Sequence, residues 1–160
     1  MSKISIIMGS QSDLETVNEA IKVLKEFKID FEAKILSAHR TPKEVAQYVE
    51  VAPNKGTKVF IAAAGMSAAL AGVVAAHTVL PVIGIPIETK NLKGLDSLLS
   101  TVQMPPGIPV ACMAIGKSGA KNAALLALEI LGISDTKIQA KLLNYKKQMR
   151  LKVKQSKIKL

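Results

Sequence analysis

Short, mostly apolar runs alternate along the chain with longer stretches in which apolar residues recur at three- or four-residue spacing. The short runs predict strands of a buried sheet, at residues 3–8, 30–35, 57–64, 82–85 and 110–116. The longer stretches predict amphipathic helices; in residues 13–27, for example, one face carries Leu14, Val17, Ile21 and Leu24. Further helices are expected from Pro42 onward, at 67–77, 95–102 and 120–131, and from Asp135 onward.

This alternation predicts an α/β fold with a parallel sheet, because such strands are joined by right-handed helical crossovers. For five strands we expect a doubly wound sheet in the order 2-1-3-4-5. The length of 160 residues predicts a single domain over residues 1–160, with its core at about 3–143. Ligands of such sheets bind beyond the carboxyl ends of the strands, where the strand order reverses. The loops after the first three strands are therefore expected to share one crevice.

The net charge of +10 is concentrated at the C-terminal end. Residues 137–160 contain nine Lys or Arg and no Asp or Glu, whereas the first 136 residues hold 13 basic and 12 acidic residues. A basic helix or tail is therefore expected over about 135–160, with a solvated helix face as the favoured interpretation. A tail that attracts phosphate or nucleic acid is the alternative, but aromatic residues do not alternate with the basic ones as base stacking would require.

The single cysteine, Cys112, excludes an internal disulfide and is typical of a reducing compartment, so a cytoplasmic location is expected. The start "MSKISIIMG" lacks the long apolar region of a signal peptide. Residues 59–87 carry no formal charge, but glycines and prolines interrupt them. They predict a buried strand, helix and strand rather than a membrane span.

The first loop, "GSQSD" at residues 9–13, combines a glycine turn, two hydroxyls and a helix start. Free backbone donors at a helix start bind phosphate, to which Ser10 and Ser12 would add their hydroxyls. Asp13 could accept hydrogen bonds from sugar hydroxyls. Ordinary helix capping is the alternative interpretation. The loop matches neither the dinucleotide motif nor the Walker P-loop.

The second loop, "SAHRTP" at residues 37–42, places a histidine beside an arginine. His39 can give or take a proton near neutral pH, and Arg40 can hold a phosphate through two parallel hydrogen bonds. In the third loop, residues 63–72, Gly65 lets the backbone approach a ligand, although close helix–sheet packing is the alternative. No residues have metal-ligand spacing, so no metal site is expected. These motifs therefore predict a phosphorylated small molecule as the ligand and one histidine as the acid/base group.

Several motifs occur together: "MGSQSD", "SAHRTP", "AGMSAALAG", "PVIGIP", "GLDSLLSTVQMPPGIPV" and "AIGKSGAKNAALLALEIL". In this order, over about residues 4–143, the chain resembles the PurE family, the N5-carboxyaminoimidazole ribonucleotide mutases of purine biosynthesis. The resemblance implies a flavodoxin-like, three-layer subunit assembled as a homo-octamer, without metal, nucleotide cofactor or ATP. It also implies a reaction that moves a carboxylate from the exocyclic nitrogen of the substrate to C4 of the same imidazole ring.

The resemblance assigns a role to each of eleven residues. His39 would be the acid/base residue, and Asp13 would bind the ribose hydroxyls. The 5′-phosphate would be bound by Ser10, Ser12 and Arg40. The base and the transferred carboxylate would be walled by Ser37, Ala38, Gly65, Ser67, Ala68 and Leu70. Met104 is expected to join Ala68 and Leu70 in an apolar wall that keeps released carbon dioxide beside C4.

The chain also departs from the family pattern. Many bacterial members read "GAGGAAHLPG" where this chain reads "AAAGMSAALAG", so Ala69 and Ala71 replace the family's His and Pro. Catalysis should therefore not depend on a histidine at position 69. Carboxylases that use free carbon dioxide resemble "SAHK" and "AGRSNGLGP"; Arg40 and the lack of the second motif favour the mutase. The alternatives are such an aminoimidazole ribonucleotide carboxylase and a non-catalytic nucleotide-binding module that would not need His39.

Overall fold

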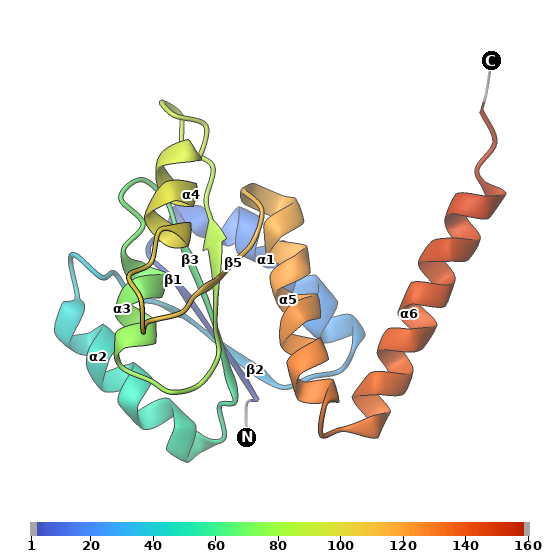
Figure 1. Cartoon of the computed structure of the whole chain (residues 1–160), viewed down its shortest axis with the longest axis horizontal. Coiled ribbons are helices and arrows are strands. Elements are labelled where there is room, and N and C mark those ends of the chain that lie inside the picture. Colours follow the sequence, from blue (N-terminus) through green and yellow to red (C-terminus); the bar gives the residue numbers. More distant parts are fainter. Residues whose placement is uncertain (1–2, 159–160) are drawn as a thin grey trace. The chain divides into compact units, whose positions relative to one another are not determined.

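The computed structural model describes residues 3–158 and contains a five-stranded parallel sheet (Figure 1). The strands are β1 (Ile4–Met8), β2 (Phe31–Ile35), β3 (Val59–Ala64), β4 (Val82–Pro86) and β5 (Ala111–Cys112). Their order is β2-β1-β3-β4-β5, which confirms the predicted order and the flavodoxin-like α/β fold.

The register of the sheet brings the ends of neighbouring strands to one edge. Met8 at the end of β1 pairs with Ile35 of β2 and with Ala63 of β3, and Ala64 pairs with Pro86 of β4. All five residues of β1 and of β4 are buried, as expected for strands covered on both faces. The loops after four strands therefore leave the sheet side by side.

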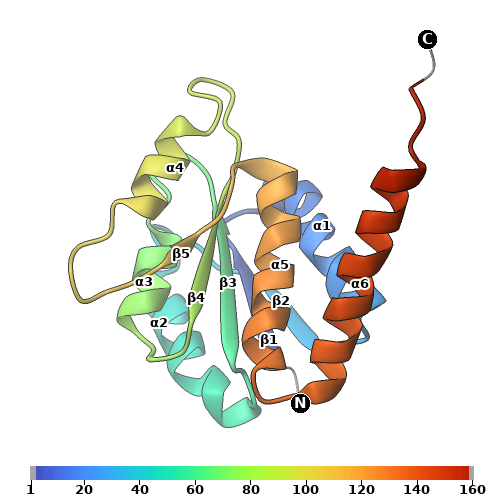
Figure 2. The same cartoon turned by 45° about the vertical axis from the view of Figure 1, so that its right-hand side comes forward.

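Helices cover both faces of the sheet. Figures 1 and 2 show α2 (Pro42–Val51), α3 (Leu70–Ala76) and α4 (Leu95–Val102) on one face. The other face is covered by α1 (Leu14–Glu26) and by the first part of α5 (Gly116–Gly132). Two 3-10 turns, η1 (Gln11–Asp13) and η2 (Ala52–Lys55), flank α1 and α2. The three layers agree with the fold that the sequence predicts.

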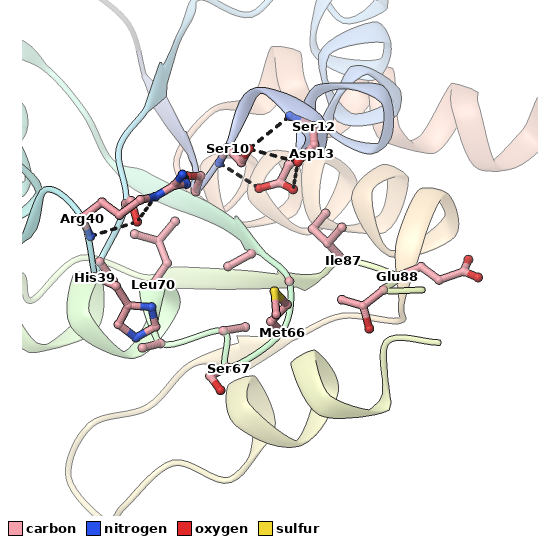
Figure 3. Close-up of a pocket in the computed structure, with 18 of the residues that line it drawn as sticks. Ser10, Ser12, Asp13, His39, Arg40, Met66, Ser67, Leu70, Ile87 and Glu88 are labelled. Atoms are coloured by element: carbon pink, nitrogen blue, oxygen red, sulfur yellow. Dashed lines mark hydrogen bonds between the residues drawn. The ribbon is translucent and has the colours of Figure 1, made fainter. Parts of the chain in front are cut away.

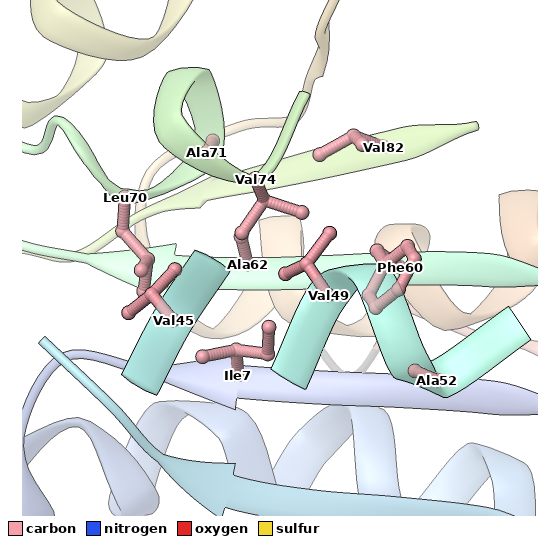
Figure 4. Packing of buried hydrophobic residues seen from close by; sticks show 10 residues of the cluster. All are labelled: Ile7, Val45, Val49, Ala52, Phe60, Ala62, Leu70, Ala71, Val74 and Val82. Atoms are coloured by element: carbon pink, nitrogen blue, oxygen red, sulfur yellow. The ribbon is translucent and has the colours of Figure 1, made fainter. Parts of the chain in front are cut away.

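The core between the sheet and the α2–α3 layer consists of aliphatic side chains and one phenylalanine (Figure 4). Val45 and Val49 of α2 lie over Ile7 of β1 and Phe60 of β3, and all four are fully buried. Full burial of a side chain of this size stabilises the fold by about 1.5–3 kcal/mol. This layer fixes the backbone from which the loops at the carboxyl edge emerge.

Three predicted boundaries are wrong by more than two residues, and one of them is the start of the helix expected at 120–131, which runs over Gly116–Gly132. The strand expected at 110–116 contains only Ala111 and Cys112, because α5 begins at Gly116, whose φ of 74° breaks an extended strand. The helix expected from Ser67 begins at Leu70. Residues 66–69 instead form two tight turns, in which Ala68 N donates to Met66 O at 2.8 Å and Ala69 N donates to Ser67 O at 2.7 Å.

The chain divides into two compact units between Ala127 and Leu128. The second unit holds the end of α5 and the basic helix α6 (Thr136–Gln155). Asp135 caps α6 by accepting from the backbone of Lys137 at 3.1 Å, and Lys146 pairs with Glu129 at 2.9 Å. The single domain over residues 1–160 stays a prediction. Among the described residues, no helix is long and apolar enough to cross a membrane.

Candidate functional site

A cleft of about 890 Å³ opens at the carboxyl edge of the sheet (Figure 3). Its walls come from the loops after β1, β2, β3 and β4. All eleven residues to which the sequence assigns a site role line it: Ser10, Ser12, Asp13, Ser37, Ala38, His39, Arg40, Gly65, Ser67, Ala68 and Leu70. The crevice predicted between the first three loops is therefore present, while the role of each residue stays a prediction.

The loop after β1 is held by a reciprocal cap. Ser10 Oγ accepts from the backbone N–H of Ser12 at 3.3 Å, and Asp13 Oδ2 accepts from the backbone N–H of Ser10 at 3.0 Å. The hydroxyl of Ser12 donates to Ser10 Oγ at 3.0 Å. Capping and a binding role are therefore compatible, because the cap orients both hydroxyls at the start of a helical segment that faces the cleft.

Asp13 is a buried carboxylate beside the cleft, with 6% of its surface exposed. Burial raises the pKa of Asp13, whereas hydrogen bonds from Ser10 and Ser12 and the charge of Arg40 oppose this rise. The raised pKa shows that burial outweighs these favourable contacts. The carboxylate is held in one orientation, with its polar atoms at the wall of the cleft.

The loop after β2 carries Arg40 across to the loop after β1. Nη2 of Arg40 donates to the carbonyl of Gly9 at 2.6 Å, and Nε donates to Ser37 Oγ at 3.3 Å. Thr41 fixes the base of this loop, because its Oγ1 accepts from Ser37 N at 2.8 Å. The guanidinium is thus placed beside the hydroxyls of the first loop, and His39, also exposed, lies farther along the cleft (Figure 3).

The loop after β3 supplies the apolar part of the cleft. Ala68 and Leu70 are only 2% and 1% exposed, and they form a wall without charged groups. Gly65 allows a close approach of the next loop, since a Cβ there would lie 3.2 Å from Cγ2 of Thr89. Met104, which the sequence places in this wall, does not line the cleft; its Sδ packs at Gly72, 3.3 Å from where a Cβ would stand.

The sequence reasoning missed the loop after β4, which completes the cleft with residues 87–90. Ile87 N donates to Ala64 O at 2.9 Å and so extends the sheet beyond β4. The start of α4 fixes this loop, since Ser97 Oγ donates to Ile87 O at 2.7 Å and Thr89 Oγ1 donates to an Asp96 carboxylate oxygen at 2.9 Å. The predicted strand order contained the necessary signal, because it places strand four next to strand three.

The polar groups of the cleft suit an anionic ligand. Hydroxyls, backbone donors and Arg40 lie around the first two loops. Within residues 3–158, no three His, Cys, Asp or Glu side chains form a group that could hold a metal ion. His39 is the histidine of the cleft, whereas His77 lies at the end of α3 and pairs with Glu50 at 3.1 Å. The arrangement can bind a phosphorylated molecule and transfer a proton next to an apolar wall.

Comparison with known proteins agrees with this description. Residues 3–152 match the family model described as AIR carboxylase. A protein of Pyrococcus abyssi named N5-carboxyaminoimidazole ribonucleotide mutase is 57% identical over 94% of this chain and 85% of its own length. Relatives of the same name in Saccharolobus solfataricus and Thermotoga maritima are 55% and 50% identical, over 94% and 96% of this chain and 94% and 88% of their own lengths.

A solved structure gives the same result at the level of the fold. The crystal structure of Treponema denticola PurE superposes with a TM-score of 0.85 at 30% sequence identity, over 94% of this chain and 92% of that chain. The cleft with its histidine, arginine and serines is therefore built on the same backbone fold as the Treponema denticola protein. Since the family model and the relatives cover nearly the whole chain, the protein belongs to the AIR carboxylase (PurE) family.

Proposed function

We propose that this protein is an N5-carboxyaminoimidazole ribonucleotide mutase, which forms 4-carboxy-5-aminoimidazole ribonucleotide in purine biosynthesis. The observation that carries the proposal is the gathering of His39, Arg40 and the Ser10–Asp13 loop around one cleft with an apolar wall. Relatives with 50–57% identity bear the mutase name.

The phosphate of the substrate binds at the first two loops in this proposal. Ser10, Ser12 and Arg40 donate to its oxygens, and the partial positive charge of the helix start adds to the attraction. Asp13 accepts from the ribose hydroxyls. The hydrogen bonds of Arg40 to Gly9 and Ser37 hold the guanidinium in place beforehand, so less side-chain freedom is lost when the phosphate binds.

The imidazole ring and its carboxylate occupy the rest of the cleft. Their walls are the small or apolar residues of the second and third loops: Ser37, Ala38, Gly65, Ser67, Ala68 and Leu70. Once the phosphate and ribose are fixed, the ring lies within reach of His39. The small side chains leave room for the carboxylate in both of its positions, on the exocyclic nitrogen and on C4.

The first chemical step breaks the carbamate. His39 as imidazolium donates its proton to the exocyclic nitrogen, the N–C bond breaks with its electron pair going to that nitrogen, and carbon dioxide is released inside the cleft. The products of this step are the aminoimidazole, carbon dioxide and neutral His39. No second acid is needed, because the nitrogen takes up only one proton.

The second step makes the new bond. C4 of the aminoimidazole attacks the carbon of carbon dioxide, and the new carboxylate takes the electron pair of one C=O bond. C4 still carries its hydrogen, which neutral His39 removes as a proton, and the ring regains its aromaticity. His39 thus returns to its starting state. Acid–base catalysis of this kind contributes about 10² to 10⁴-fold, and confinement of carbon dioxide beside C4 raises its effective concentration.

The second candidate is an aminoimidazole ribonucleotide carboxylase that uses free carbon dioxide, which the description of the family model favours. One assay distinguishes the two: product formation from N5-carboxyaminoimidazole ribonucleotide, compared with aminoimidazole ribonucleotide plus bicarbonate. The mutase forms product faster from the first substrate at equal concentration. Faster product formation from the second pair would establish the carboxylase, and binding without turnover of either would establish the non-catalytic module.

The proposal extends to assembly and location. A homo-octamer is supported by the apolar residues Leu95, Leu99 and Val102, which recur along α4 and are each about half exposed. Light scattering should give a mass eight times the 17.0 kDa of one chain, and a monomeric mass would contradict the octamer. A cytoplasmic location is supported by the single cysteine.

A further inference from the structure

Met66 differs from the other apolar residues of the cleft because it is exposed. Its side chain is 68% exposed, whereas Leu70 and Ile87, the other large apolar residues of the described lining, are 1% and 8% exposed. Its neighbours Gly65 and Ser67 are small. The chain therefore presents one flexible thioether to the open space of the cleft.

The backbone of Met66 adopts a conformation that non-glycine residues rarely take. Its φ is 58°, in the left-handed region, and the turns formed by the N–H groups of Ala68 and Ala69 hold it there. A glycine would adopt this φ without steric cost. Because the side chain is mostly exposed, little packing in the free protein offsets the strain, and strain of this kind is typical of functional sites.

The position of Met66 suits contact with a bound ring. Figure 3 shows it in the middle of the cleft, between Leu70 and Ile87, with His39 on the Leu70 side. A methionine side chain has three rotatable bonds and a polarisable sulfur that packs well against aromatic rings. It can therefore close over an imidazole held between these walls, and its exposed surface would then be buried.

We propose that Met66 is a positioning residue that covers the reacting imidazole and confines carbon dioxide beside C4 between the two chemical steps. This inference rests on the proposed mutase function and deepens it. Carbon dioxide is uncharged, so once the N–C bond breaks, apolar surfaces have to confine it. Ala68 and Leu70 supply one such surface, and Met66 supplies the cover on the open side.

The test follows the fate of the carboxylate. N5-carboxyaminoimidazole ribonucleotide labelled with ¹³C in its carboxylate is converted in buffer that contains unlabelled bicarbonate, and the label retained in the product is compared with the aminoimidazole ribonucleotide released. Non-enzymatic decarboxylation is subtracted from a run without enzyme. The variants are Met66→Gly, which removes the cover and suits the left-handed backbone, and Met66→Leu, which keeps an apolar cover. Val79→Ala, a fully exposed apolar residue outside the cleft, is the matched control.

We expect Met66→Gly to raise the ratio of released to transferred carbon dioxide by about tenfold, with an unchanged or higher melting temperature. Met66→Leu should retain much more of the ¹³C label in the product than Met66→Gly does, and Val79→Ala should retain as much as the wild type. A purely structural role for Met66 would lower turnover or melting temperature without changing this ratio, and that result would overturn the inference. If Met66→Gly retained as much of the label as the wild type, the proposed role of Met66 would also be overturned, but the mutase function would not be affected. A wild-type protein that forms no product from the labelled substrate would overturn both.

Discussion

The guanidinium of Arg40 donates to the backbone carbonyl of Gly9 at 2.6 Å, and this hydrogen bond joins the loop after β2 to the loop after β1. The two residues are 31 positions apart in the sequence. The bond puts a permanent positive charge beside the hydroxyls of Ser10 and Ser12, where the proposed phosphate binds. Arg40 is therefore both a link between two loops and a candidate ligand of the substrate.

Arg40→Ala should weaken substrate binding by about 1.5–3 kcal/mol, the usual contribution of a charge-assisted hydrogen bond. Arg40→Lys should recover only part of the loss, because an ammonium group lacks the planar fork that binds phosphate through two bonds. Calorimetric titration with the substrate measures both values. Arg150→Ala, which removes a positive charge from α6, is the control and should bind as the wild type does. Unchanged affinity in both Arg40 variants would show that Arg40 does not contact the phosphate.

His39→Asn should retain substrate binding and lose at least about 10²-fold in turnover, the lower end of acid–base contributions. His77→Asn is the matched control, because His77 is exposed and lies outside the cleft, so its replacement should leave turnover unchanged. Turnover close to that of the wild type in His39→Asn would contradict the mechanism.

Asp13 should make the stability of the fold depend on pH. Burial raises its pKa above the ordinary value of 3.8, so the folded protein binds the proton more tightly than the unfolded chain does. The contribution of Asp13 to the free energy of unfolding is therefore present below pH 3.8 and falls as the pH rises through the raised pKa. We expect the stability of the wild type relative to Asp13→Asn to decline over this window and then level off.

Denaturant titrations of both proteins at several pH values measure this difference. Asp30→Asn removes an exposed carboxylate outside the cleft and controls for the loss of one negative charge. A difference between wild type and Asp13→Asn that grows with pH would mean that hydrogen bonds and Arg40, rather than burial, dominate at Asp13.

Tyr48→Phe should lower the free energy of unfolding by about 1 kcal/mol, the net contribution of a typical hydrogen bond. The Tyr48 hydroxyl donates to Glu32 Oε2 at 3.0 Å and lies 3.0 Å from Ser5 Oγ, and burial raises the pKa of Tyr48 to about 12. Ser5 keeps its bond to Thr57 at 2.8 Å in the variant, which limits the loss. Turnover should not change, because Tyr48 does not line the cleft. Denaturant unfolding measures the loss of stability, and the mutase assay measures turnover. Reduced turnover in a stably folded variant would contradict the expectation that turnover does not change.

Much of the fold could be predicted because local and global preferences agree. Apolar runs between amphipathic helices allow few topologies once crossovers are right-handed, so the order 2-1-3-4-5 followed from the pattern. That order, with polar residues such as Ser10 and His39 directly after strands, also predicted which loops meet. The eleven residues to which the family resemblance assigns roles come from these loops, and all of them line one cleft.

Features that depend on contacts between distant residues were decided by the tertiary structure alone. The apolar run 110–116 predicts a strand, but only Ala111 and Cys112 are in register with β4. Met113 adds one backbone hydrogen bond to Gly84 at 2.9 Å before Gly116 turns the chain into α5. The sequence predicts Met104 in the cleft wall, but its side chain packs at Gly72 instead. The three-dimensional path of the chain decides this contact. The left-handed backbone of Met66 and the approach of Thr89 to Gly65 are likewise set by turns and packing, which the periodicity of apolar residues does not encode.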